Sequence, residues 1–172
     1  MYITQALKRN VQLFPNKTST AYLDRSFTWQ ESLERISKIA YSIKKLDVSE
    51  GDRVAILAHN SDRYFEFLYS VSWAGAVFVP INTRLAPPEI EFWIDDSESK
   101  LLFVDKNFAE IVINLKKENK ISSVKNIVYL SDDACPDNMI NYEDLITSAT
   151  TEDALRGYDD FCLLYTSPSP RD

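Results

Sequence analysis

Two side chains in the 172-residue sequence have the type and position of catalytic or ligand-binding groups. His59 is the only histidine and follows a predicted strand, where an imidazole could act as a general base. The sequence shows no carboxylate or nucleophile to pair with it, so we interpret it as a residue at a helix start. Arg84 also follows a predicted strand, and in open α/β sheets ligands gather at the carboxyl ends of strands. Its guanidinium could pair with a phosphate or be solvated.

Two pairs of adjacent aspartates, Asp95–Asp96 and Asp132–Asp133, carry the carboxylates that a metal ion or acid–base chemistry would use. They fall at a predicted helix end and in a predicted loop, where aspartates are usually solvated. We therefore assign them no catalytic or metal-binding role. Cys135 and Cys162 lack the spacing of metal ligands and the density of a disulfide scaffold, which favours free thiols in a reducing compartment.

The composition argues against several classes of protein. The net charge of −7, from 26 acidic and 19 basic side chains, does not favour contact with nucleic acid or anionic lipid. No apolar run approaches the roughly 20 residues of a membrane span, and the first residues lack the pattern of a signal peptide. We expect one globular domain in the cytoplasm, with no membrane span and no nucleic-acid partner.

The elements that position these residues alternate between strand and helix from Gly51 onward. Short apolar runs typical of buried strands are separated by segments of helical periodicity, which cover residues 64–74, 87–94 and 107–115. Strands separated in this way need crossover connections. The pattern predicts an α/β fold, a mainly parallel sheet with helices on both faces, with strands at 54–58, 77–81, 101–104 and 126–130.

The segment before Gly51 predicts a short helix, a hairpin turning at Asp24-Arg25 and a second helix. Thr28 and Glu31 have the capping-box spacing that starts such a helix. The helix should end near Asp47, where a left-handed residue would favour glycine. At the other end, residues 131–160 are polar and acidic, and we interpret them as a surface connection with a short helix at 142–148.

The order of several short blocks resembles the large domain of AMP-forming acyl-CoA synthetases, in the adenylate-forming superfamily. The blocks are Gly-Asp-Arg-Val-Ala-Ile at 51–56, Asn-Ser at 60–61 and Ala-Gly-Ala-Val-Phe-Val-Pro-Ile-Asn at 74–82. Further similarity follows at 83–85, 89–91 and 96–100. Each block alone is weak, so their order carries the signal. The chain resembles the N-terminal, incomplete part of that large domain.

The resemblance implies a ligase that activates a small carboxylic acid with ATP and Mg²⁺ and transfers the acyl group to CoA. Backbone N–H groups and magnesium would stabilise the charge that develops on the phosphates. By resemblance, the loop of Arg84 lies near the nucleotide end of CoA. The family's adenosine contacts and C-terminal domain lie downstream of this sequence, so we expect this fragment to be inactive by itself.

The last residues suggest two origins. Tyr165, Thr166 and Ser167 resemble the approach to the family's phosphate loop, with Thr166 and Ser167 at its start. Pro168 stands where the first loop glycine belongs, and proline lacks the N–H and the φ freedom of a phosphate cradle. Residues 162–172 also reverse-translate, in one frame, to a transposase adapter of sequencing libraries. We expect 1–161 to be the partial domain and 162–172 a non-native tail, against a divergent natural terminus.

Other functions stay open from the sequence alone. A stand-alone α/β interaction or nucleotide-binding module would share this pattern. A peptide-synthetase adenylation domain or a luciferase-like oxygenase would share the scaffold within the superfamily. A dinucleotide-binding dehydrogenase is disfavoured because the sequence has no Gly-x-Gly-x-x-Gly motif and only three glycines.

Overall fold

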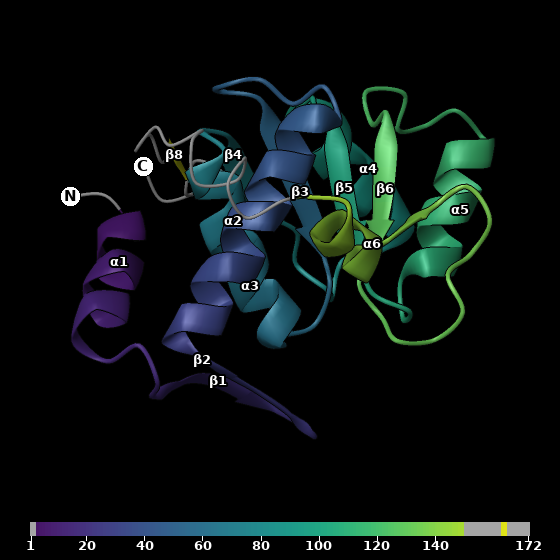
Figure 1. Ribbon diagram of the computed structural model, residues 1–172. Coiled ribbons are helices and arrows are strands. Elements are labelled where there is room, and N and C mark those ends of the chain that lie inside the picture. Colours follow the sequence, from purple (N-terminus) through teal and green to yellow (C-terminus); the bar gives the residue numbers. More distant parts are fainter. Residues whose placement is uncertain (1–2, 150–162, 165–172) are drawn as a thin grey trace.

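The computed structural model describes residues 3–149 and 163–164 of the chain. They form a six-stranded sheet in which every neighbouring pair is parallel, in the order β7-β6-β5-β3-β4-β8 (Figure 1). The strands are β3 (Arg53–Leu57), β4 (Val77–Pro80), β5 (Leu101–Val104), β6 (Asn126–Tyr129), β7 (Ile140–Asn141) and β8 (Leu163–Leu164). Strands β3 to β6 occur where the sequence predicts them, so the predicted parallel α/β sheet is confirmed.

Helices cover both faces of the sheet because successive strand residues point to opposite faces. Ile56 and Phe103 lie in a core with α1, α2, α3 and α6, whereas Leu57 and Val104 lie in a second core with α4 and α5. The helices are α1 (Ile3–Leu13), α2 (Trp29–Lys45), α3 (Asp62–Trp73), α4 (Pro87–Asp96), α5 (Ala109–Lys117) and α6 (Tyr142–Thr147). The predicted coverage of both faces is confirmed.

Helix α2 begins and ends as predicted. The backbone N–H of Glu31 donates to the Thr28 hydroxyl at 3.2 Å, and the Thr28 N–H donates to the Glu31 carboxylate at 2.7 Å. At the other end Leu46 is the C-cap, and Asp47 follows with a φ of +62°. The helix therefore ends in a left-handed residue that is aspartate rather than glycine, which costs backbone energy.

A two-stranded antiparallel hairpin precedes α2, formed by β1 (Thr18–Tyr22) and β2 (Arg25–Thr28). The predicted turn at Asp24-Arg25 is one residue too late, because Tyr22 pairs with Arg25 and leaves Leu23 and Asp24 as the turn. Leu23 has a φ of +52°, the left-handed conformation that two-residue hairpin turns require. Arg25 thus belongs to a strand, which fixes the direction of its side chain.

The prediction that 131–160 is only a surface connection was wrong for β7 and α6. Tyr142 is 1% exposed, and Leu145 and Ile146 are also buried, in the core that α2 and α3 share. These three residues have the i, i+3, i+4 spacing of one helix face. Of the acidic residues between them, Asp144 is exposed and Glu143 is half-buried. The polar composition hid this apolar stripe. Residues 150–160 lie outside the described part of the chain.

Candidate functional site

Parallel strands bring their carboxyl ends to one edge of the sheet, so the residues that follow different strands meet there. His59 follows β3, Asp105 follows β5 and Ser131 follows β6. The hairpin reaches the same edge with Tyr22 and Arg25, and in Figure 1 it lies on the side toward which the β6 arrow points. We refer to this region as the carboxyl edge. It is the place where the topology collects chemically useful side chains.

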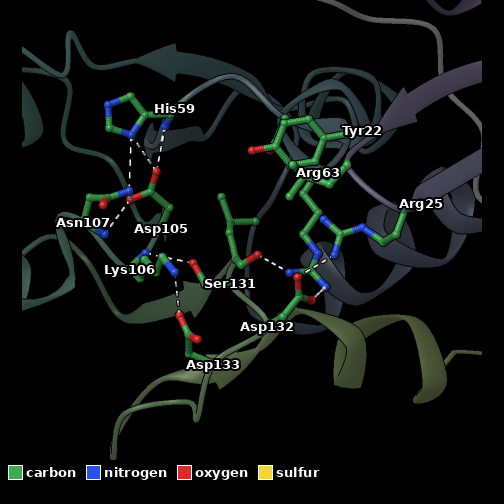
Figure 2. Close-up of a pocket in the computed structure, with 13 residues that line it drawn as sticks. Tyr22, Arg25, His59, Arg63, Asp105, Lys106, Asn107, Ser131, Asp132 and Asp133 are labelled. Atoms are coloured by element: carbon green, nitrogen blue, oxygen red, sulfur yellow. Dashed lines mark hydrogen bonds and ion pairs between the residues drawn. The ribbon is translucent and has the colours of Figure 1, made fainter.

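A cavity of about 190 Å³ opens at the carboxyl edge. It lies where β3 and β5 are neighbours, while the helices that follow them, α3 and α5, pack on opposite faces. Such a switch in the direction of the connections leaves a crevice in open α/β sheets. Figure 2 shows His59 and Asp105 on one side of the cavity and Arg25 and Arg63 on the other.

On the first side, the carboxylate of Asp105 organises a small polar cluster. Its Oδ2 accepts a hydrogen bond from the His59 backbone N–H at 2.8 Å and lies 3.3 Å from the His59 Nδ1. Its Oδ1 accepts from the Asn107 backbone and side chain, at 2.8 and 3.1 Å. The pair has the geometry of a histidine oriented by a carboxylate. The carboxylate that the sequence did not reveal thus lies 46 residues away, and the interpretation of His59 as a residue at a helix start stays a prediction.

On the second side, two arginines join the hairpin, α3 and the loop after β6. Arg25 holds Asp62 with two hydrogen bonds of 2.7 and 3.0 Å and reaches Asp132 at 2.5 Å. Arg63 donates to the Leu130 carbonyl and, at 2.6 Å, to Asp132. Because Arg63 and Asp62 are only 4% exposed, these charges depend on their partners.

The four aspartates that the sequence analysis interpreted as solvated differ in their surroundings. Asp95–Asp96 is exposed at the end of α4, and Asp133 pairs with Lys106 at 3.2 Å. Asp132 is 64% exposed yet bridges two arginines. Burial opposes its ionisation, but the hydrogen bonds from Arg25 and Arg63 outweigh this effect and lower the pKa of Asp132. Asp132 is therefore a structural ion-pair partner.

Behind the cavity, Glu66 of α3 is the centre of a buried network. It is 1% exposed and is held by Arg35, through two hydrogen bonds of 2.5 and 3.1 Å. The Tyr142 hydroxyl donates to it at 2.7 Å. Burial raises the pKa of Glu66, and the interaction with Arg35 opposes that rise. Glu143 bonds both Arg35 and Arg63, so the network connects α2, α3 and α6 to the cavity.

The sequence analysis missed this network, although a signal for it exists. Asp62, Glu66 and Ser70 recur every four residues and form a polar stripe on α3, and all three are buried. The apolar stripe of Phe67 and Val71 runs beside it. Carboxylates directly beside an apolar stripe lie at the border of the packed face, where burial requires a charged partner.

The predicted cofactor-binding residues are not brought together with this cavity. Arg84 follows β4 on the same edge, is exposed, and its backbone N–H donates to the Asn82 side chain at 3.0 Å. The cavity lining does not include Arg84. Thr166 and Ser167 lie outside the described residues. The assignments of Arg84 to CoA and of Thr166 and Ser167 to a phosphate loop stay predictions.

The described residues do not by themselves fit a site for Mg²⁺ and ATP. In the part of the chain that the structure describes, no group of three His, Cys, Asp or Glu side chains could hold a metal ion. The Asp105 carboxylate already accepts hydrogen bonds from backbone N–H groups. Asp132 and Asp133 form ion pairs with arginine and lysine side chains. The cavity has balanced charges that suit a neutral polar group better than a triphosphate.

This parallel sheet, covered by helices on both faces and with a crevice at a topological switch point, defines an open α/β protein. The sequence profile of the AMP-binding enzyme family matches residues 7–169. The chain therefore belongs to that family, and it corresponds to the N-terminal part of adenylate-forming acyl-CoA synthetases.

Three similar proteins support this membership. A feruloyl-CoA synthase of Amycolatopsis sp is 32% identical over 162 residues, which cover 94% of this chain and 30% of that protein. A peroxisomal butyrate–CoA ligase of Arabidopsis thaliana is 40% identical over 106 residues, 62% of this chain and 18% of that protein. The crystal structure of an anthranilate CoA ligase with anthranoyl-AMP matches 88% of this chain and 29% of its own, with a TM-score of 0.82 and 24% identity, which shows the shared fold.

This chain thus spans less than a third of the length of these curated relatives.

Proposed function

We propose that the complete protein is an ATP-dependent carboxylic acid–CoA ligase. A carboxylate oxygen attacks the α-phosphorus of ATP, and pyrophosphate leaves to give an acyl-adenylate. The thiolate sulfur of CoA then attacks the acyl carbon, and AMP leaves with the bonding electron pair. The proposal depends mainly on a feruloyl-CoA synthase that is 32% identical to this chain over 94% of its length. The anthranilate ligase supports it, because its structure holds anthranoyl-AMP, an acyl-adenylate.

Within this reaction, the chain supplies the sheet whose carboxyl edge carries the binding loops. Arg84 is exposed at the end of β4 and would pair with a phosphate of CoA. In the competing case, in which the last residues are natural, Thr166 and Ser167 would start the loop that contacts the phosphates of ATP. The residue types at these positions suit such contacts, since guanidinium and hydroxyl groups donate hydrogen bonds to anionic oxygens.

The 172-residue chain itself is proposed to be inactive, with residues 1–161 as a partial large domain and 162–172 as a non-native tail. Pro168 supports this division, because it removes an N–H that a phosphate loop needs. The nucleotide sequence after the Phe161 codon tests it. Adapter codons followed by vector would support the division, and a natural reading frame with codons unlike the adapter would refute it.

Acid-dependent pyrophosphate release by the complete gene product tests the proposed reaction. Ferulate, benzoate and butyrate are suitable first substrates, because relatives named for these acids match this chain. We expect release with at least one acid and thioester formation when CoA is added. Release without acid would indicate simple ATP hydrolysis, and no release with any carboxylate would refute the ligase assignment.

The role of Arg84 has a separate test in the same protein. Arg84→Ala should raise the KM for CoA several-fold and leave acid-dependent pyrophosphate release unchanged, because only the second half-reaction uses CoA. Arg9→Ala is the matched control, since Arg9 is exposed on α1. An unchanged KM for CoA would show that Arg84 is a solvated surface residue.

Two alternatives follow from the features that the chain shares with other proteins. An adenylation domain would release pyrophosphate with an acid but transfer the acyl group to a carrier thiol instead of CoA. A stand-alone interaction or nucleotide-binding module would release none and would bind its ligand as this chain alone. Thioester analysis with CoA, and nucleotide titration of the 172-residue chain, separate these outcomes from the proposed ligase.

The proposed compartment is the cytoplasm. Over the described residues, no helix combines the length and apolar character needed to cross a bilayer. Several plant relatives are named as peroxisomal, so the peroxisome is the competing location. Imaging fluorescent fusions of the complete protein decides between them. The fluorophore is placed at the N-terminus in one fusion and at the C-terminus in another, so that a targeting signal at either end is unblocked in one of them.

A further inference from the structure

A second cavity lies at the opposite edge of the sheet from His59. It occupies about 340 Å³ between the last turns of α5 and the residues that begin β6 and β7. Ile113, Ile127 and Met139 give it an apolar floor, and Lys116, Lys117 and Lys125 line its rim. We call it the lysine groove. Its volume lies in the range of small-molecule sites, roughly 300–1,000 Å³.

The cations of the lysine groove are mostly free to meet a ligand. The Lys116 ammonium donates to the Val124 carbonyl. The ammonium groups of Lys117 and Lys125 have neither an ion pair nor a hydrogen bond with any described residue. Asp137 is the acidic residue in the lining, so three lysines face one carboxylate in a chain whose net charge is −7.

The end of α5 favours positive charge beside the groove. Lys116 and Lys117 belong to the last turn of α5, where the helix dipole stabilises positive charge. Lysine stems can cover an apolar floor while the ammonium groups stay at its rim. A ligand with an apolar body and one anionic end would therefore satisfy both parts of the groove at once.

We propose that the lysine groove binds a small organic carboxylate with an alkyl or aryl body. This site lies at the amino edge of the sheet, so it is separate from the carboxyl edge where ligase chemistry is proposed, and it does not depend on that chemistry. A polyanion fits less well, because the negative charge of the whole chain repels it. The concave shape of the groove also favours a small molecule over a flat membrane surface.

Methionine NMR of the full 172-residue chain offers a direct test, with octanoate as the probe. The sequence contains two methionines: Met1, which precedes α1, and Met139, which lines the groove. With ¹³C-methyl methionine, octanoate should shift the Met139 signal in a saturable way and leave the Met1 signal in place. Met139→Leu assigns the signal, and 1-octanol, which lacks the carboxylate, should shift it far more weakly.

Charge variants locate the carboxylate. Lys117→Gln and Lys125→Gln should each weaken octanoate binding about two- to fivefold, as expected for exposed ion pairs. Asp137→Asn should tighten binding by about twofold, because it removes the repelling charge. Arg9→Gln removes one positive charge from α1, away from the groove, and should leave the dissociation constant unchanged.

Several results would overturn the proposal. One is an absent or non-saturable Met139 shift in a chain whose circular dichroism shows the α/β fold. Others are equal effects of octanoate and 1-octanol, or equal weakening by Arg9→Gln and the two groove variants. None of these results depends on ATP, so failure here leaves the ligase proposal standing, and failure of the ligase proposal leaves this one standing.

Discussion

The two faces of the sheet bury different chemistry. The face under α2, α3 and α6 contains Asp62, Arg63 and Glu66, each at most 4% exposed, together with the buried Tyr142 hydroxyl. On the face under α4 and α5, the buried polar side chains among the described residues include Ser97 and Ser99, whose hydroxyls bond each other at 2.7 Å. One face is therefore held by ion pairs as well as apolar contacts, and the other largely by apolar contacts.

The difference shows how the fold couples its core to the carboxyl edge. Arg63 lines the cavity and also bonds Glu143, which in turn bonds Arg35 beside Glu66. A change in the buried network should thus alter both stability and the shape of the cavity. On the other face, Phe108 packs against the apolar core and its ring centroid lies 5.2 Å from that of His59. That face therefore meets the cavity through an aromatic contact instead of a chain of ion pairs, and changes deeper in its core should act mainly on stability.

The largest expected effect comes from leaving Glu66 without its partner. Arg35→Met should lower the free energy of unfolding by about 3–5 kcal/mol, because breaking one side of a buried ion pair strands a charge. Urea denaturation followed by circular dichroism measures this. If the double variant Arg35→Met/Glu66→Leu recovers none of the loss, the cost is not the stranded carboxylate.

On the apolar face, the comparable perturbation is a cavity left by a shortened side chain. Ile94 is fully buried under α4, and Ile94→Ala should cost about 3 kcal/mol. This loss should be the same at pH 5 and pH 8, because the side chain that is removed is apolar and carries no titrating group. A loss that varies with pH would contradict the contrast between the two faces.

The end of α2 supplies a smaller effect on the ion-paired face. Asp47→Gly should raise the free energy of unfolding by about 1 kcal/mol, because glycine adopts the positive φ of this position without a Cβ clash. Asp47→Ala is the control, as it removes the charge but keeps the Cβ. Equal stabilisation by alanine would attribute the gain to charge instead of backbone conformation.

The smallest expected effect is the pH dependence that Glu143 contributes. Burial alone would raise the pKa of Glu143, but Arg35 and Arg63 lower it below its ordinary value of 4.5. Its stabilisation is thus present above that value and is lost as the pH falls through the lower folded-state value. Below about pH 4.5, the free energy of unfolding should therefore fall less in Glu143→Gln than in the parent, by a difference of less than about 1 kcal/mol.

Denaturation curves at several acidic pH values check this effect. Glu66 acts in the opposite sense, since its raised pKa favours the protonated folded state. Because Glu66 and Glu143 share Arg35, the comparison reports the change in this coupled group. An identical acid decline in the Glu143→Gln variant and the parent would show that Glu143 contributes nothing.

Local patterns were enough to predict most of the fold. Short apolar runs located strands β3 to β6, because these strands are buried on both faces, and helical spacing located the helices between them. The Thr28 capping box and the left-handed Asp47 follow from contacts within one turn. Helix α6 was placed correctly, but its packing into the core was missed because acidic neighbours masked Tyr142.

The candidate site was harder to predict, since its contacts join residues distant in the chain. His59 and Asp105 follow neighbouring strands that are not consecutive, so only the strand order makes them partners. Arg25 and Asp132 are 107 residues apart and meet through the hairpin. Sequence spacing contains no record of such pairs, whereas the polar stripe of α3 could have indicated buried charges.

Acid-dependent AMP formation from labelled ATP tests most directly whether this sheet is a support that needs the rest of the enzyme. The purified 172-residue chain and the complete gene product are compared with the same carboxylic acids, each with CoA present so that AMP can leave the acyl-adenylate. We expect AMP and pyrophosphate in equal amounts from the complete protein and none above background from the chain. Acid-dependent AMP formation by the chain alone, persisting through further purification, would contradict this account.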